Sequence, residues 1–100
     1  MTESSLTTQS PPRLRLGRLV TTPGAYEALA AANVSIVDLL NRHARGDWGE
    51  LPEEDRQQNE LAVTTGQRVL SSYRLGNGQK IWIISEADRA STTVLLPDDY

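Results

Sequence analysis

Arginine and leucine alternate in residues 13–20 (RLRLGRLV), near the start of the chain. A period of two is typical of a strand with one buried face, so Leu14 and Leu16 are expected to point inward. Gly17 interrupts the alternation and suggests a β-bulge. The pattern therefore predicts a first strand over residues 13–20.

Three more strand-like runs lie nearer the C-terminus, in residues 68–75, 80–84 and 92–96. The first two flank Gly-Asn-Gly at residues 76–78, and because these residues tolerate positive φ, the pattern predicts a hairpin. The run IWII within residues 80–84 is apolar on both faces, which indicates a central strand with a neighbour on each side.

Three helical patterns occupy the middle of the chain. The first begins with Thr22 as N-cap before Pro23 and ends at Asn33, and the second begins at Ser35 and ends at Gly46. We expect the first to bury Tyr26, Leu29 and Ala30. We expect the second to bury a stripe made by Ile36, Leu39, Leu40 and His43.

The third helical pattern runs from Pro52 to Gly66 and has a thin apolar stripe. Asn59 lies on the same face as Ala62 and Val63. If that face packs inward, the Asn59 side chain should be buried and hydrogen-bonded.

Together these patterns predict an α+β fold with an antiparallel sheet of three to four strands and three helices packed on one face. Residues 13–20 are added at an edge of the sheet. The folded domain spans residues 13–100, and the polar, pattern-free residues 1–12 form a flexible tail. The second face of the central strand also needs cover, and a homodimer through the sheet is one way to supply it.

Composition excludes several kinds of site. The chain has no cysteine and one histidine, so disulfides and thiolate or multi-histidine metal sites are ruled out, and we expect no cofactor and no metal. No apolar run is long enough to span a membrane, and the N-terminus lacks the pattern of a signal peptide. We therefore expect no membrane association and a cytoplasmic location.

The net charge of −3 is distributed unevenly. Residues 46–66 hold six acidic groups and one basic group, whereas residues 1–45 hold five basic and three acidic groups. Nucleic-acid binding usually needs a basic face, so a nucleic-acid partner is not expected. DNA-binding regulation stays as an alternative function through a small basic edge formed by Arg13, Arg15 and Arg18.

The loop of residues 85–91 carries Glu86, Asp88 and Arg89, which are the parts of an acid/base site. An exposed charged turn, in which Asp88 and Ser91 bond the local backbone and Arg89 pairs with an acid, explains the same residues. His43 is either a general base or a packed side chain at the end of its helix. A small ribonuclease-like toxin is thus an alternative function, with His43 as base, Glu86 as acid and Arg89 at the phosphate, although the acidic balance argues against it.

Trp48 lies in the connector between the second and third helical patterns, with glycine at positions 46 and 49 and acids around it. An aromatic residue in this setting either plugs the edge of the core or anchors a partner. The nearby acids lack the spacing of a calcium loop, and stabilisation of a helix start explains those at residues 53–55.

Two stretches of the chain, LLNRHARGDWGELPEEDRQQNE (39–60) and YRLGNGQKIWIISEADRASTTVLLPDDY (73–100), include the distinctive strings GDWG and KIWII. In these stretches the chain resembles a family of small uncharacterised proteins encoded on bacterial plasmids and integrative elements, sometimes labelled plasmid-related proteins. The resemblance implies a mobile-element setting, in which small accessory proteins regulate maintenance or transfer, or blunt host defences such as restriction and CRISPR systems. It brings no catalytic or binding residue with it.

We therefore expect a non-enzymatic protein-interaction module, either an anti-restriction or anti-CRISPR protein or a regulatory accessory. Its partner would be a host or element-encoded protein with a basic surface, because carboxylates steer basic partners. The expected contact surface is acidic and aromatic and comprises Asp47, Trp48, Glu50, Glu53, Glu54, Glu86, Asp88 and Arg89.

Overall fold

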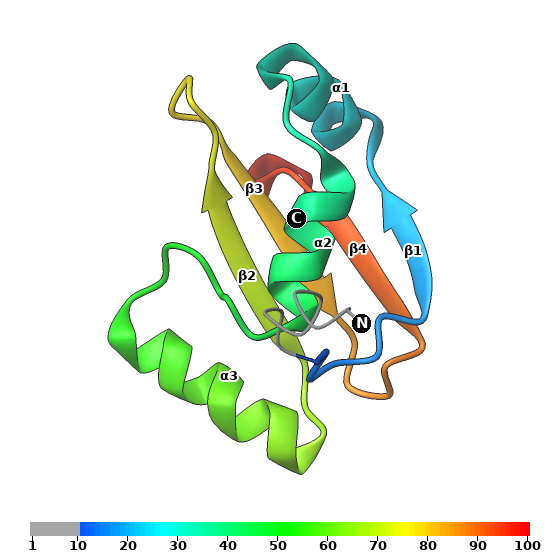
Figure 1. Ribbon diagram of the computed structural model, residues 1–100, viewed down its shortest axis with the longest axis vertical. Coiled ribbons are helices and arrows are strands. Elements are labelled where there is room, and N and C mark those ends of the chain that lie inside the picture. The colour runs from blue at the N-terminus through cyan, green and yellow to red at the C-terminus, as the bar shows by residue number, and fades with distance from the viewer. Residues whose placement is uncertain (1–10) are drawn as a thin grey trace, which may run out of the picture.

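The computed structural model describes residues 11–100, which form four strands, three α-helices and one short 3-10 helix (Figure 1). Most of the predicted flexible tail, residues 1–12, lies outside the described residues; Pro11 and Pro12 are described and are exposed. The strands form one sheet in the order β1-β4-β3-β2, so the predicted α+β class is confirmed.

The sheet is mixed rather than wholly antiparallel. β2 (Val69–Arg74), β3 (Lys80–Ser85) and β4 (Ser91–Leu95) form an antiparallel meander with β3 in the interior, as the IWII run predicted. β1 (Arg18–Thr21) pairs with β4 in parallel. Parallel neighbours need a long connection, and here it contains all three helices and two strands.

β1 is shorter than predicted, because residues 13–17 do not pair with the sheet. Instead the backbone N–H groups of Arg13 and Leu14 donate to the carbonyl oxygen of Ala44, at 2.7 and 3.1 Å, and so bind the segment to the end of a helix. Leu14 is buried and Leu16 partly buried, as the alternation predicted.

Gly17 marks a close crossing of two backbones and not a bulge. Its φ is 65°, and a Cβ at this position would lie 2.5 Å from the carbonyl oxygens of Arg89 and Ala90. Only glycine fits here, because it combines a positive φ with the absence of a side chain.

The helices begin and end close to the predicted residues. The Thr22 hydroxyl accepts the N–H of Ala25 at 3.2 Å, and Asn33 ends the first helix with φ 58°, so both predicted caps are confirmed. The Ser35 hydroxyl likewise accepts an N–H at the start of the second helix. The helices are α1 (Pro23–Ala32), α2 (Ile36–Ala44), α3 (Glu53–Thr65) and the 3-10 helix η2 (Pro97–Asp99).

The main core lies between the sheet and the helices α1 and α2, with α2 crossing one face of the sheet (Figure 1). α1 buries Leu29 as predicted, but Tyr26 is 65% exposed and Ala30 is also exposed. The face that α1 turns toward the sheet is rotated from the predicted one. The buried members of this core are Ala25, Ala28, Leu29, Leu39, Leu40, Tyr73, Leu75, Ile81, Ile83 and Val94.

α3 packs against the edge strand β2 and projects beside the sheet (Figure 1). Only Asn59 and Ala62 are buried on this helix. The Asn59 side chain donates to the carbonyl of Leu70 at 2.6 Å and accepts its N–H at 3.3 Å. The predicted burial and bonding of Asn59 are therefore confirmed, and the amide acts as a backbone substitute at the edge of β2.

Candidate functional site

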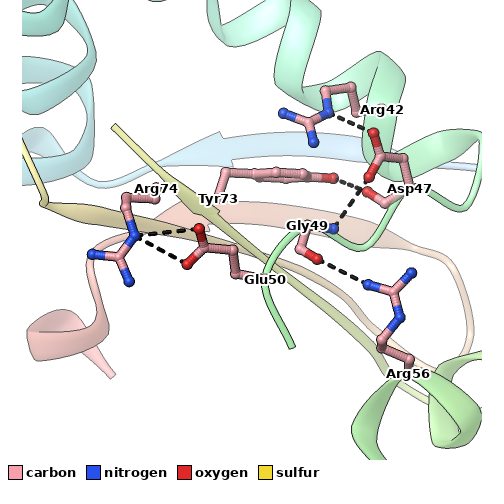
Figure 2. Close-up of a pocket in the computed structure, with 7 residues that line it drawn as sticks. All are labelled: Arg42, Asp47, Gly49, Glu50, Arg56, Tyr73 and Arg74. Carbon is pink, nitrogen blue, oxygen red and sulfur yellow. Dashed lines mark hydrogen bonds and ion pairs between the residues drawn. The ribbon is translucent and has the colours of Figure 1, made fainter. Parts of the chain in front are cut away.

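The surface has a hollow of about 420 Å³ where the end of α2 meets the connector to α3, the first turns of α3 and the end of β2 (Figure 2). Three guanidinium groups, two carboxylates and a phenol ring line it. We call this region the charged hollow, and its residues are Arg42, Asp47, Gly49, Glu50, Arg56, Tyr73 and Arg74.

The connector reaches the hollow because it docks on the outer edge of β2. The backbone N–H of Ser72 donates to the carbonyl of Trp48 at 3.0 Å, and the N–H of Glu50 donates to the carbonyl of Ser72 at 2.6 Å. Gly49, between them, has φ 75°, and a Cβ there would overlap the Ser72 carbonyl. Any other residue would push the connector off the strand.

Trp48 itself is a core residue, with 1% of its surface exposed. Its Nε1 donates to Glu60 Oε2 at 2.9 Å, and its ring meets the His43 ring edge-on, with 5.9 Å between centroids. A partner cannot reach the ring, so Trp48 is removed from the expected contact surface. The alternative that the sequence offered, a plug at the edge of the core, is confirmed.

Arg42 and Asp47 form one side of the charged hollow. Arg42 Nε donates to Asp47 Oδ2 at 2.7 Å, and its guanidinium carbon lies 4.6 Å from the centroid of the Tyr73 ring. The hydrogen bond from Arg42 lowers the pKa of Asp47, and the same bond raises the pKa of Arg42. Both groups therefore stay charged at neutral pH, and the stacked ring fixes the direction of the guanidinium.

The Tyr73 ring lies directly beneath the Arg42 guanidinium. Its hydroxyl donates to the Asp47 carbonyl at 2.5 Å, and burial raises the pKa of Tyr73 to about 12. The phenol is thus neutral and its position is fixed by the backbone of the connector.

The other side of the hollow is formed by a second ion pair and a third arginine. Arg74 Nε donates to both Glu50 carboxylate oxygens, at 3.0 and 3.3 Å. Arg56 Nη1 donates to the Gly49 carbonyl at 2.9 Å, and so ties α3 to the connector (Figure 2).

These contacts leave hydrogen-bonding capacity in the hollow. Arg42 and Arg74 use Nε for their ion pairs, and among residues 11–100 their terminal Nη groups make no hydrogen bond to the protein. A guanidinium carries five N–H donors in a fixed plane, so each of these arginines can still bind a carboxylate or a carbonyl of a partner.

His43 lies behind the hollow in a buried, linear chain of hydrogen bonds. The Thr92 hydroxyl donates to the Leu16 carbonyl at 2.7 Å, so the Ser85 hydroxyl must donate to Thr92, also at 2.7 Å. Ser85 Oγ then accepts from His43 Nε2 at 2.9 Å, and His43 Nδ1 accepts from Ser71 Oγ at 2.6 Å. Because a hydroxyl donates once, the chain has one direction and assigns the neutral Nε2–H tautomer to His43.

This chain makes His43 a structural residue. Its side chain is fully buried, and burial, together with the charge of Arg89, lowers its pKa to about 4. A base needs access to the proton that it abstracts, and none exists here. The packed side chain, one of the two readings that the sequence left open, is confirmed, and the geometry gives no support to a ribonuclease centre on His43.

The loop of residues 85–91 is a stabilised charged turn. Asp88 Oδ1 accepts the N–H of Ala90 at 2.9 Å. The Arg89 guanidinium donates to the carbonyls of Gln67, Glu86 and Ala62, at 2.7, 2.9 and 3.1 Å. The charged turn that the sequence offered is confirmed for Asp88, which bonds the local backbone. Arg89 differs from that expectation, because among residues 11–100 its guanidinium bonds backbone oxygens and not an acid.

The predicted acidic surface is divided by the fold. Glu53 and Glu54 lie in the first turn of α3 and are exposed beside the hollow. Arg89 contacts α3 at Ala62, roughly 13 Å further along the helix axis at 1.5 Å per residue. The group of Asp47, Glu50 and the first turn of α3 is therefore separate from the group of Glu86, Asp88 and Arg89.

Of the three arginines in the expected basic edge, Arg13 is neutralised by an ion pair. Arg13 donates to both carboxylate oxygens of Glu60, at 2.7 and 3.2 Å, and this bond raises the pKa of Arg13 and lowers that of Glu60. Arg15 and Arg18 remain exposed on this side. Two arginines are a weak electrostatic footprint for DNA.

The sequence did not identify the three arginines and the tyrosine of the hollow. Only Arg42 had a usable signal, because it lies one position before the buried His43 and so must point to the flank of α2. Arg56, Tyr73 and Arg74 come from two other elements, and their meeting depends on how the connector docks.

Within residues 11–100, no group of three or more acidic or histidine side chains is placed to hold a metal ion. The described helices include none that is long and apolar enough to cross a membrane.

No family model, curated protein or solved structure matches this chain. The resemblance to the plasmid-related family, carried by residues 39–60 and 73–100, stays a prediction. The geometry of the charged hollow is therefore the main indication of function.

Proposed function

We propose that the protein is a non-enzymatic protein-interaction module and that the charged hollow is its contact surface. The observation that carries the proposal is the set of three arginines held in place by ion pairs, a tyrosine ring and a backbone carbonyl. The only histidine is buried behind this surface and cannot serve as a base in the hollow.

Prior fixation of the arginines favours binding. Immobilising a long side chain costs about 0.5–1.5 kcal/mol when a complex forms. Arg42 and Arg74 are already restricted in the free protein, because each guanidinium is held by a carboxylate. They therefore lose less conformational freedom when a partner binds. Arginine and tyrosine are also the residues that most often dominate the binding energy of protein interfaces.

The charges of the hollow indicate a partner that carries both signs. The free Nη groups of the arginines suit carboxylates or main-chain carbonyls of the partner. The exposed carboxylates of Glu53 and Glu54 border the hollow and attract basic side chains during encounter. The partner is therefore a protein with a basic surface that also supplies acidic or carbonyl acceptors to the arginines.

The resemblance adds a biological setting to this proposal. In a mobile element, a small binding module serves as an anti-defence protein or as a regulatory accessory that blocks or recruits a host protein. On the same basis we propose that the protein acts in the cytoplasm.

An exchange of charges in the hollow tests the proposal. The double variant Glu50→Arg/Arg74→Glu keeps an ion pair between the two positions but exchanges the positions of the positive and negative charges at the surface. Tagged wild type, the double variant and the control Glu27→Lys, whose exposed side chain lies on α1, are used to capture partners from nuclease-treated bacterial lysate. Captured proteins are identified by mass spectrometry and their affinities measured with purified components.

We expect wild type and Glu27→Lys to bind the same partner, and the double variant to lose at least about tenfold in affinity, or about 1.4 kcal/mol. Unfolding curves check that the double variant is folded. If the folded double variant binds every recovered protein as tightly as wild type, the charged hollow is not the contact surface.

A further inference from the structure

The two edges of the sheet are finished differently. On the β2 edge, the Asn59 amide binds both backbone groups of Leu70, and the connector binds both backbone groups of Ser72. The chain thus covers this edge with its own polar groups. Covered edges cannot template the addition of another strand.

Among the described residues, nothing covers the β1 edge in this way. The N–H groups of Arg18 and Thr22 donate to the carbonyls of Ala90 and Val94 in the β4 register, at 2.9 and 3.0 Å. Backbone groups alternate in direction along a strand, so the N–H and C=O groups of Leu19 and Thr21 point away from the sheet. Within residues 11–100, nothing pairs with them from the outer side.

The side chains at this edge are apolar and exposed. Leu19 is 54% exposed and Val20 is 40% exposed. They alternate faces, so Leu19 lies on the face covered by the helices and Val20 on the opposite face, beside Thr93. An unpaired edge with apolar residues on both faces is the arrangement to which an additional strand binds.

We propose that β1 pairs antiparallel with β1 of a second copy of this chain, about a two-fold axis at Val20, to form one continuous sheet of eight strands. Leu19 of each copy then lies opposite Thr21 of the other, and these two pairs exchange four hydrogen bonds between outward-pointing groups. Val20 faces Val20 of the second copy across the axis in a pair without hydrogen bonds.

The sequence of β1 is complementary to itself in this register. Arg18, the charged residue of the strand, lies opposite Thr22 of the second copy, so the two arginines do not face each other. The centre of the contact is uncharged, which suits a second copy of the same strand better than a nucleic acid.

The covered edge determines how the assembly ends. Because Asn59 and the connector cover β2, each copy has one edge available, and pairing through β1 makes a closed dimer with no further growth. The contact comprises one short strand from each copy, so we expect it to be at the weak end of specific interfaces, with dissociation in the micromolar range.

Single cysteines test the register, because the natural chain contains none. In an antiparallel pair without hydrogen bonds the Cα atoms are about 4.5 Å apart, which a disulfide can span. We therefore expect Val20→Cys to form a disulfide-linked dimer on mild oxidation. In the matched variant Leu19→Cys the two thiols are displaced by two residues along the strand, with Cα atoms roughly 8 Å apart, and should not cross-link.

Sedimentation of the cysteine-free chain gives an independent readout. We expect wild type to pass from monomer to dimer as its concentration rises. Val20→Lys should remain monomeric, because two ammonium groups would meet at the axis. Val37→Lys is the control, since it changes an exposed valine on α2 in the same way and should dimerise like wild type.

The proposal is overturned if wild type stays monomeric at all concentrations, or if Val20→Cys cross-links no faster than Leu19→Cys. Capture of an extended peptide or a nucleic acid by the β1 edge of a monomeric chain would also overturn it. These readouts use no partner of the charged hollow, so the two proposals succeed or fail separately.

Discussion

Arg42 and His43 are neighbours on α2, and the fold places them in opposite surroundings. Arg42 lies at the charged hollow with 41% of its side chain exposed, in an ion pair with Asp47. His43 is buried against the sheet and bonded to Ser71 and Ser85. Within one turn of helix the protein thus uses a solvent-exposed charge pair on one side and a neutral, directional hydrogen-bond chain on the other.

The difference shows which polar groups hold the fold together and which are available for binding. Water can replace a lost partner at the hollow, so a substitution there costs little stability. No water can replace a lost partner in the His43 chain, because its members are buried. Residues of the charged hollow can therefore be substituted with little loss of stability, whereas substitution in the His43 hydrogen-bond chain is costly.

The largest expected effect comes from truncating the two neighbours separately. We expect His43→Ala to lower the free energy of unfolding by about 3 to 5 kcal/mol, because it opens a cavity and leaves the Ser71 hydroxyl without its acceptor. Arg42→Ala should cost about 1 kcal/mol or less. Urea unfolding of wild type and both variants at neutral pH measures the two values.

Similar losses from the two variants would contradict the comparison. In that case either His43 is accessible to water, or the Arg42 guanidinium contributes more packing on the Tyr73 ring than an exposed ion pair allows.

The next effect is the dependence of stability on pH. The folded pKa of His43, about 4, lies below the value of roughly 6.5 expected in the unfolded chain. Between these values the unfolded state binds more protons, so stability is complete above about pH 6.5 and falls by on the order of 3 kcal/mol as the pH drops to about 4. The pKa of Asp47 is lowered by Arg42, so its own loss comes only at lower pH.

His43 is the only histidine, so its NMR titration can be followed without ambiguity. The variant His43→Gln, which does not titrate but keeps an amide donor near Ser85, should lack the stability loss between about pH 6.5 and 4. A folded-state pKa near 6.5 in the NMR titration would show that the hydrogen-bond chain is open to solvent.

Local patterns were sufficient to predict most of the fold. The caps at Thr22 and Asn33, the end of α3 at Gly66 and the central position of β3 are confirmed, because each depends on neighbouring residues in the sequence. The errors arose where distant segments decide. Residues 13–17 look like a strand, but the end of α2 accepts their N–H groups, and α1 meets the sheet through Ala25 and Ala28 and not through Tyr26.

The candidate site was harder to predict than the fold. The sequence singled out the acids Asp47 and Glu50 but not their partners Arg42 and Arg74, which lie 5 and 24 residues away along the chain. Trp48 was left with two roles, since composition cannot tell which side of the connector faces β2. That choice depends on one close contact, the docking of Gly49 on Ser72.

The smallest expected effect is the coupling between Arg42 and Asp47. In a double-mutant cycle with Arg42→Ala and Asp47→Ala, we expect a coupling of about 0.2–1 kcal/mol in the free energy of unfolding, because both side chains are nearly half exposed. Screening by salt should reduce it further. Its matched cycle, Ser71→Ala with His43→Gln, should give a larger coupling that is insensitive to salt, because the pair is buried and uncharged. A salt-insensitive Arg42–Asp47 coupling above about 2 kcal/mol would mean that the hollow supports the fold as the His43 chain does, and would remove the reason for assigning it to binding.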